Sequence, residues 1–563
     1  MSSSVEDEAS VSYPEVKGIR TEDFQLPPTG LSEQQRTKAL SQLREYLSVQ
    51  KSNFLGYQVN EDLDYREDFQ EYLDYHINNV GDPFISGNLT LNTKVMERAV
   101  LDYYAALWHA KWPHNPDNGE SYWGYVVTMG CTEGNLYALW NARDYLAGKL
   151  LLEEQAGDEE ARVASLEGPP QTPPRRLIYR QATPVKKNLN AYKPVVFYSE
   201  DTHYSIVKAG IILGLQTFYE IGSHDYPDQN PLAPGQPWPK EVPSKQGAAG
   251  PGSIDIVALV QLVEFFAVKG YPILICFNYG TTFKGAYDDV EAAGHALMPV
   301  FKRLGLEQRK VYYDPNDLTK FDLRNGYWFH VDGALGAAYM PFLEMAYQSG
   351  EIAQRGPNFD FRLPFVHSIA MSGHKWIGAP CPCGIYMTKI KYQLRPPDNP
   401  EYLGSPDTTF AGSRNGLSPM FLWDYLAKNS YEKQIQKALY TERMADYACQ
   451  QLKALEARLD RDLWIERSPL SLTIRFRQAH PDLIFKYSLS SETLYVSGQK
   501  RAYSHIFIMG HVTPELIDCL IQDLGQSDAF PSPEAELFRW SEEVLPSGAK
   551  DLVHFPHIGR GFR

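Results

Sequence analysis

A lysine set among apolar residues is the first candidate for chemistry in this sequence. Lys375 lies in SIAMSGHKWIG (368–378), where a short apolar run ends in Ser372 and His374 and where Trp376 follows the lysine. Burial lowers the pKa of a lysine because desolvation disfavours the ammonium. A neutral amine is what a Schiff base with an aldehyde cofactor requires. The same stretch would also suit a lysine that extends to solvent beside a core strand. The choice between these two interpretations therefore depends on other residues.

Three further polar residues come directly after apolar, strand-like runs. These are His203, Thr282 and Asp332. Each has an ordinary explanation: a loop histidine, a turn threonine, or an aspartate that caps the next helix. In an open α/β sheet, however, ligands bind at the carboxyl ends of the strands. We therefore expect these side chains to converge near Lys375.

A candidate anion site lies where a strand-like run ends at Met129 and a helical pattern begins. Gly130, Cys131 and Thr132 occupy this junction. The free N–H groups and the dipole of a helix N-terminus favour a bound phosphate. Thr132 would serve equally well as a plain helix cap, so the hypothesis depends on the other groups.

Alternating helical and apolar segments position these residues and predict a mostly parallel sheet flanked by helices. The strand-like segments are 121–129, 193–198, 271–279, 326–332, 368–372 and 384–389, and helical patterns cover 131–146, 204–214 and 254–270. An earlier amphipathic pattern predicts a helix from about residue 32 to 49.

Beyond residue 390 the pattern changes. A long amphipathic helix at 431–459, two strand-like segments and a helix at 514–524 predict a smaller α+β domain. We therefore expect four regions: 1–95, a mobile lead-in followed by helices; 96–390, the large α/β domain; 391–527, the small domain with a loop before it; and 528–563, an extended tail.

Composition excludes several classes of protein. The chain has 563 residues, enough for more than one domain, and a net charge of −15, which argues against nucleic-acid or anionic-membrane partners. Only Cys381 and Cys383 of the six cysteines lie close together, so we expect no metal site and reduced thiols in a cytoplasmic protein. The polar N-terminus predicts no signal peptide, and no apolar run is long enough to span a membrane.

Together these groups match what pyridoxal phosphate needs: an anion site, a carboxylate for the ring nitrogen, a flat stacking group and a lysine for the aldehyde. The sequence resembles the group II pyridoxal-phosphate-dependent amino-acid decarboxylases, which have fold type I, and most of all the histidine/serine decarboxylase-like branch. The resemblance covers about residues 50–525. It rests on seven motifs in the family's order: NNVGDPF, GCTEGN, SEDTHYSIVKA, NYGTTFKGAYDD, HVDGALGAAYMPF, SGHKWIG and DTTFAGSRNG.

The resemblance implies a role for each residue around the cofactor ring. Lys375 would bind the aldehyde, Asp332 would pair with the pyridinium nitrogen, and His203 would stack on one ring face. Ala334 would pack on the other face, and Thr282 would lie near the 3-oxygen. The supporting contacts would be Asp288 behind Thr282, and the backbone at Cys131 and Thr132 with Ser372 and His374 at the phosphate.

The family is also dimeric with shared active sites, which implies contacts across an interface. We expect helices of the N-terminal segment to pack on a partner subunit of a homodimer. Ser413 and Arg414 would complete the phosphate site of the partner, and Tyr402 would be the mobile-loop tyrosine that protonates the product carbanion. The substrate pocket is expected to include Tyr57, Asn79, Asp82, Pro83 and Phe84.

The implied reaction is decarboxylation of an L-amino acid to an amine and CO₂, through aldimine and quinonoid intermediates. Oxidative deamination to an aldehyde on the same cofactor stays an alternative, although His203 and Tyr402 are both present. Aminotransfer and a catalytically silent binding protein are further alternatives, and intact Lys375 and Asp332 argue against the silent protein. Serine, aliphatic and aromatic substrates all stay open. The insertions at 153–176 and 222–252 yield no function.

Overall fold

The large domain is built on one seven-stranded sheet with the order β1-β11-β10-β9-β6-β4-β5. The computed structural model describes residues 16–155, 175–184, 186–314, 316–394 and 400–531. All neighbouring strands from β10 to β5 run parallel, whereas β11 is antiparallel to both β1 and β10. The sheet strands are β1 (Tyr122–Val127), β4 (Val195–Phe197), β5 (Gln216–Thr217), β6 (Ile273–Asn278), β9 (Tyr327–Asp332), β10 (Ser368–Ser372) and β11 (Gly384–Lys389).

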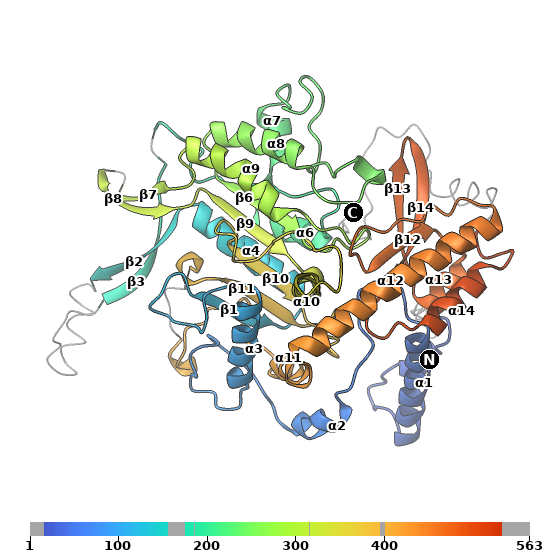
Figure 1. The fold of residues 1–563 in the computed structure, drawn as a ribbon. Helices are drawn as coiled ribbons and strands as arrows, with labels where there is room; N and C mark the ends of the chain where they lie inside the picture. Colours follow the sequence, from blue (N-terminus) through green and yellow to red (C-terminus); the bar gives the residue numbers. More distant parts are fainter. Residues whose placement is uncertain (1–15, 156–174, 185, 315, 395–399, 532–563) are drawn as a thin grey trace, which may run out of the picture.

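Helices cover both faces of this sheet (Figure 1). The helices of the large domain are α3 (Lys94–Leu107), α4 (Cys131–Leu146), α6 (Tyr204–Leu213), α7 (Phe218–Asp225), α8 (Ile256–Val268), α9 (Val290–Arg303) and α10 (Gly336–Gln348). Alternate residues of β6 serve the two layers: Ile273, Ile275 and Phe277 pack with α8 and α9, whereas Leu274 and Cys276 face the layer of α4 and α6. A strand buried on both sides needs such a continuous apolar run, which is why the sequence pattern identified it.

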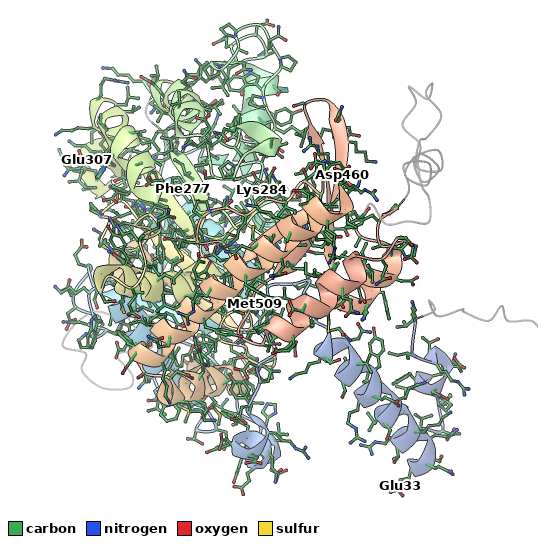
Figure 2. All side chains as sticks on the ribbon, turned by 45° about the vertical axis from the view of Figure 1, so that its right-hand side comes forward. Glu33, Phe277, Lys284, Glu307, Asp460 and Met509 are labelled. Carbon is green, nitrogen blue, oxygen red and sulfur yellow. The ribbon has the colours of Figure 1, made fainter. Side chains whose placement is uncertain are left out.

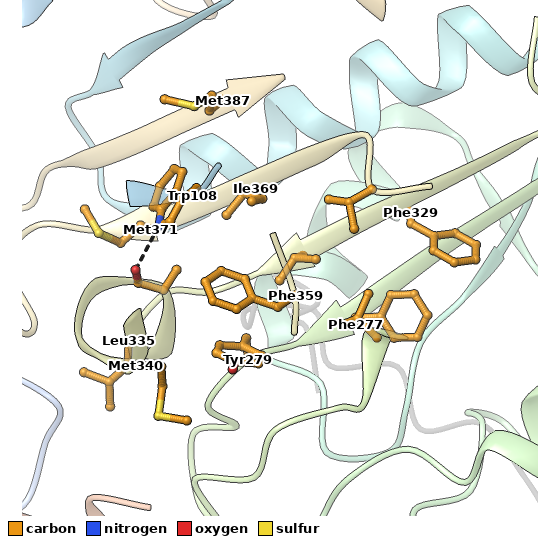
Figure 3. Packing of buried hydrophobic residues seen from close by; sticks show 14 of the residues in the cluster. Trp108, Phe277, Tyr279, Phe329, Leu335, Met340, Phe359, Ile369, Met371 and Met387 are labelled. Atoms are coloured by element: carbon orange, nitrogen blue, oxygen red, sulfur yellow. Dashed lines mark hydrogen bonds between the residues drawn. The ribbon is translucent and has the colours of Figure 1, made fainter. Parts of the chain in front are cut away.

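Large aromatic side chains fill the layer shared by α3, α10 and the sheet. Figure 3 shows Phe277 and Phe329 from adjacent strands beside Phe359 and Tyr279. The indole of Trp108 donates a hydrogen bond to the Ala337 carbonyl at 2.9 Å, which satisfies its one polar group inside this core. The core thereby fixes the strand ends that carry the candidate site.

The small domain follows α11 (Leu417–Lys428) and packs against the large domain along α12 (Tyr431–Leu459), which contacts α10. It contains a three-stranded antiparallel sheet, β12-β14-β13. Its remaining elements are β12 (Thr473–Arg477), α13 (Pro481–Tyr487), β13 (Ser490–Val496), β14 (Gln499–Phe507) and α14 (Pro514–Leu524). A separate apolar cluster, to which α12, α14 and the sheet contribute, forms its core.

Two hairpins outside the central sheet were not predicted. They are β2 (Lys149–Gln155) with β3 (Arg175–Gln181), and β7 (Arg309–Asp314) with β8 (Asp317–Arg324). The segment 153–176 was interpreted as a charged insertion, but its ends belong to β2 and β3; residues 156–174 lie outside the described residues. The insertion at 222–252 is anchored by Trp238, which is 4% exposed.

The N-terminal segment begins with a projecting helix, and its later residues pack against both domains. Helix α1 (Glu33–Ser52) begins with a capping box between Ser32 and Gln35, and α2 (Arg66–Phe69) is a single turn. Figure 2 shows α1, with Glu33 at its far end, projecting away from the body of the molecule. Only Ala39 is buried in α1. The expected lead-in before residue 16 and most of the expected tail lie outside the described residues.

Two kinds of feature are absent from the described residues. None of their helices is long and apolar enough to cross a membrane. Within the same ranges, no group of three or more His, Cys, Asp or Glu side chains is arranged to hold a metal ion.

Candidate active site

Lys375 lies just beyond the end of β10, in the loop that joins β10 to β11. Its Nζ donates a hydrogen bond to Oε1 of Gln58 at 2.8 Å, and its carbonyl accepts one from the N–H of Asn60 at 3.1 Å. Burial lowers the pKa of Lys375, although the nearby Asp332 and Cys131 oppose the shift. The amine is therefore held in place and is more readily deprotonated than a surface lysine.

Asp332 ends β9, the parallel neighbour of β10, and is only 6% exposed. Its Oδ2 accepts a hydrogen bond from Nδ2 of Asn135 at 2.7 Å. Its Oδ1 lies 3.2 Å from the N–H of Ala334 and 3.3 Å from Sγ of Cys131. Burial and the neighbouring carboxylate raise the pKa of Cys131 well above its usual value, so the thiol stays protonated and can donate. The carboxylate of Asp332 is thus surrounded by hydrogen-bond donors.

His203 caps the N-terminus of α6. Its Nδ1 accepts a hydrogen bond from the N–H of Ser205 at 3.3 Å and lies 2.8 Å from Oγ of the same serine. Burial lowers the pKa of His203; the charge of Asp332 opposes this shift, and the charge of Lys375 adds to it. A neutral imidazole with the proton on Nε2 follows, since Nδ1 is occupied as an acceptor.

The expected phosphate site lies where α4 begins, beside the loop that carries the lysine. The N–H of Cys131 points to Oγ of Ser372 at 3.2 Å, and Nδ1 of His374 lies 3.3 Å from the Cys383 carbonyl. Gly130 has φ of +71°, and a Cβ there would approach Cε1 of His374 to 2.8 Å. Glycine therefore allows the turn to pass close to the histidine.

These groups have the chemistry that pyridoxal phosphate needs. A helix N-terminus with a serine hydroxyl beside it suits a phosphate, and a buried lysine suits the aldehyde. Asp332 suits a protonated ring nitrogen. Thr132, at the first turn of α4, and Ala334, two residues after Asp332, border the same strand ends.

Thr282 and Asp288 lie on the loop after β6. The carbonyl of Thr282 accepts a long hydrogen bond, 3.5 Å, from Nε2 of Gln58, the glutamine that also contacts Lys375. Asp288 is fully buried and accepts from the N–H groups of Ile254 and Asn278, at 2.6 and 2.7 Å. Burial raises the pKa of Asp288 to about 7, while these hydrogen bonds oppose the shift. Asp288 therefore anchors the loop that carries Thr282.

Three of the predicted residues lie away from this cluster within the chain. The side chain of Tyr402 is 80% exposed, and Ser413 accepts a hydrogen bond from Asn78 near the surface. The Arg414 side chain is fully buried, ion-paired with Glu97 and bonded to two backbone carbonyls of its own chain. This placement differs from the expectation that Arg414 reaches a partner's phosphate site, because its guanidinium is enclosed within its own chain.

The expected substrate-pocket residues lie on two loops of the N-terminal segment. Tyr57 is 54% exposed, and its neighbour Gln58 points to Lys375 instead. Asn79 is bonded to Glu97 and Thr93, and Asp82 accepts from Trp123 and Thr408. The hydrogen bonds of Asn79 and Asp82 therefore stabilise the loop that carries these two residues. In the same loop, the Pro83 carbonyl accepts from Arg98 at 2.7 Å and the Phe84 ring stacks on His114, with ring centroids 3.6 Å apart.

Sequence reasoning missed two residues that the structure brings into the cluster. Gln58 comes from the N-terminal segment, 317 residues before Lys375, and no local pattern links the two. Asn135 sits on the buried face of α4 one turn after Cys131. A polar side chain on the core face of a helix was a usable signal, because buried polar groups require partners.

Comparison with known proteins identifies relatives of the whole chain. Residues 175–450 match the family described as the pyridoxal-dependent decarboxylase conserved domain. The crystal structure of L-methionine decarboxylase from Streptomyces sp.590 is 46% identical, with a TM-score of 0.82 over 90% of this chain and 98% of that one. Histidine decarboxylase of Solanum lycopersicum is 28% identical over 91% of this chain and 93% of the relative. Serine decarboxylase 1 of Oryza sativa subsp. japonica is 26% identical, over 91% and 80%.

Proposed function

The chain belongs to the pyridoxal-phosphate-dependent amino-acid decarboxylases, and we propose that its substrate is L-methionine or an amino acid of similar shape. It has fold type I, as the sequence predicted, and is a carboxy-lyase that converts an L-amino acid into an amine and CO₂. The observation that supports methionine is the 46% identity to the Streptomyces L-methionine decarboxylase. The histidine and serine decarboxylases above are only 28% and 26% identical.

Each residue of the cluster around Lys375 has a separate proposed role. When bound, pyridoxal phosphate supplies the electron sink for the charge left by departing CO₂. Asp332 would pair with the protonated ring nitrogen. Lys375 would offer its amine to the aldehyde, and Gln58 holds that amine in place. His203 would stack on the ring as a neutral imidazole.

A substrate panel tests the proposed specificity. Purified holoenzyme is incubated separately with L-methionine, L-histidine, L-serine and the other standard L-amino acids, and CO₂ release and product mass are measured. We expect 3-methylthiopropylamine from L-methionine, with kcat/KM at least about 100-fold higher than for histidine or serine. Preferential release of the amine of histidine or of serine would overturn the substrate proposal, and an aldehyde with ammonia and peroxide would indicate the oxidative reaction.

We further propose a homodimer with shared active sites. Large apolar side chains are exposed along the N-terminal segment, more than a monomer usually leaves in water. They are Leu40, Leu47, Val49, Leu63, Tyr72, Leu73, Tyr75, Ile85, Leu89, Leu91 and Val95. The exposed Tyr402 is free to enter a partner's site, where it would donate the proton to the product. The six cysteines, all free thiols, support a cytoplasmic location.

Mixing two inactive variants tests this shared site. In a dimer of one Lys375→Ala and one Tyr402→Phe subunit, one of the two sites keeps both functional residues if Tyr402 acts across the interface. Random association in a two-fold dimer then restores about a quarter of wild-type activity. If Tyr402 acts within its own subunit, the mixture stays as inactive as its parts. Each variant mixed with itself is the control, and sedimentation checks the dimer.

A further inference from the structure

We propose that Asn135 is a positioning residue that holds the Asp332 carboxylate and fixes the tautomer of His203 through one side-chain amide. The proposal rests on the roles proposed above for Asp332 and His203. The amide nitrogen of Asn135 donates to Oδ2 of Asp332 at 2.7 Å and to Oγ of Ser205 at 2.9 Å. Its oxygen lies 2.9 Å from Nε2 of His330. The residue is 1% exposed, so these contacts do not compete with water.

The donor and acceptor roles in this network are fixed at both of its ends. The indole N–H of Trp328 can only donate, and it lies 3.0 Å from Oγ of Ser368. The hydroxyl hydrogen of Ser368 is then available to Nδ1 of His330, 2.9 Å away, so Nε2 carries the imidazole proton and donates to Asn135. At the other end the Asp332 carboxylate can only accept. The NH₂ group of Asn135 must therefore face Asp332.

Burial keeps the imidazole of His330 uncharged. It lowers the pKa of His330 to about 4, more than the neighbouring Asp332 raises it, so the imidazole is uncharged near neutral pH. A neutral His330 donates to Asn135 without placing a second cation beside Asp332. The carboxylate therefore stays available to the ring nitrogen as its one charged partner.

The second N–H of Asn135 acts on His203. By donating to Ser205, it occupies a lone pair of that hydroxyl and directs the hydroxyl hydrogen to Nδ1 of His203, 2.8 Å away. The backbone N–H of Ser205 also donates to Nδ1. With two donors on Nδ1, the proton of the neutral imidazole belongs on Nε2. The Asn135 amide thus contacts Asp332 directly and reinforces the tautomer of His203 through Ser205.

The alternative is that Asn135 only satisfies buried polar groups of α4. Asn141 offers a matched control, because it is the same residue type on the same helix, is 6% exposed, and bonds Tyr386 and the backbone of Leu394 instead of Asp332, Ser205 or His330. A purely structural role predicts the same consequences for Asn135→Leu and Asn141→Leu. A positioning role predicts different ones.

The test measures three quantities on the holoenzyme: the dissociation constant of pyridoxal phosphate, the pH dependence of the bound cofactor's visible absorbance, and the pH profile of kcat/KM. For Asn135→Leu we expect kcat/KM and cofactor affinity to fall about 10- to 100-fold, as for loss of a hydrogen bond to a charged group. The acidic limb of the profile should move to higher pH, because a carboxylate with fewer donors protonates more readily. Asn141→Leu should leave the profile and the absorbance titration unchanged.

Two further variants separate the possible failures. Asn135→Asp has nearly the same shape and keeps the acceptor for His330, so it tests the proposal if the leucine variant does not fold; it should move the acidic limb in the same direction. An unchanged pH profile in Asn135→Leu or Asn135→Asp, with Asp332→Asn strongly impaired, would overturn this inference alone. If Asp332→Asn also keeps wild-type activity and absorbance, the proposed role of Asp332 is wrong, and the role inferred for Asn135 is then wrong as well.

Discussion

Replacing Lys375 by alanine is expected to abolish decarboxylation, with kcat lowered at least about 10³-fold, or ~4 kcal/mol in the barrier. The lysine contacts Gln58 and lies beside Asp332 and Cys131. Loss of the amine removes the group that holds the aldehyde and returns it after each turnover. Kinetics with the preferred substrate measure the effect directly.

Chemical trapping shows whether the same lysine carries the cofactor. Borohydride reduction of the holoenzyme, followed by peptide mass spectrometry, should place the pyridoxyl group on Lys375 and on no other residue. Lys375→Arg keeps a cation at the site without a usable amine, and it should fail in the same way as alanine. Labelling of another buried lysine, such as Lys284, which is ion-paired with Asp201, would contradict the assignment.

The sequence predicted the central sheet and the convergence of Asp332, His203 and Lys375, because both depend on local patterns. Strands buried on both faces require continuous apolar runs, and the helices at 431–459 and 514–524 were predicted at the bounds that the structure shows. Asp332, His203 and Lys375 converge because each follows a strand of one parallel sheet, and parallel strands bring their carboxyl ends to one edge.

The parts of the fold and site that the sequence did not predict depend on contacts between distant segments. The strands of the hairpins β2–β3 and β7–β8 carry several charged residues each, so their sequences lack the continuous apolar run of a core strand. The approach of Gln58 to Lys375 joins the N-terminal segment to the large domain, and such a contact has no signature at either residue. For Arg414 the sequence did contain a signal, since the residue lies in a family motif and suggested a phosphate ligand. In the structure its buried guanidinium is ion-paired with Glu97 of the same chain.

Replacing Asp332 by asparagine is expected to lower kcat at least about 10²-fold, or ~2.7 kcal/mol, while the fold persists. Asparagine has nearly the same shape, and its oxygen can still accept from Asn135 or from the N–H of Ala334. It carries no charge, however, so it cannot hold the proton on the ring nitrogen. The electron sink weakens although the cofactor still binds to Lys375.

The matched control is Asp332→Glu, which restores the charge on a longer side chain. We expect activity between those of the wild type and Asp332→Asn, because the charge returns while the geometry set by Asn135 and Cys131 is lost. Melting temperature and cofactor content should change little in Asp332→Asn, which would separate a chemical effect from unfolding. A loss of less than about tenfold in Asp332→Asn, with cofactor bound, would mean that another group holds the ring proton, because a paired charge at this site is expected to contribute more than ~1.4 kcal/mol.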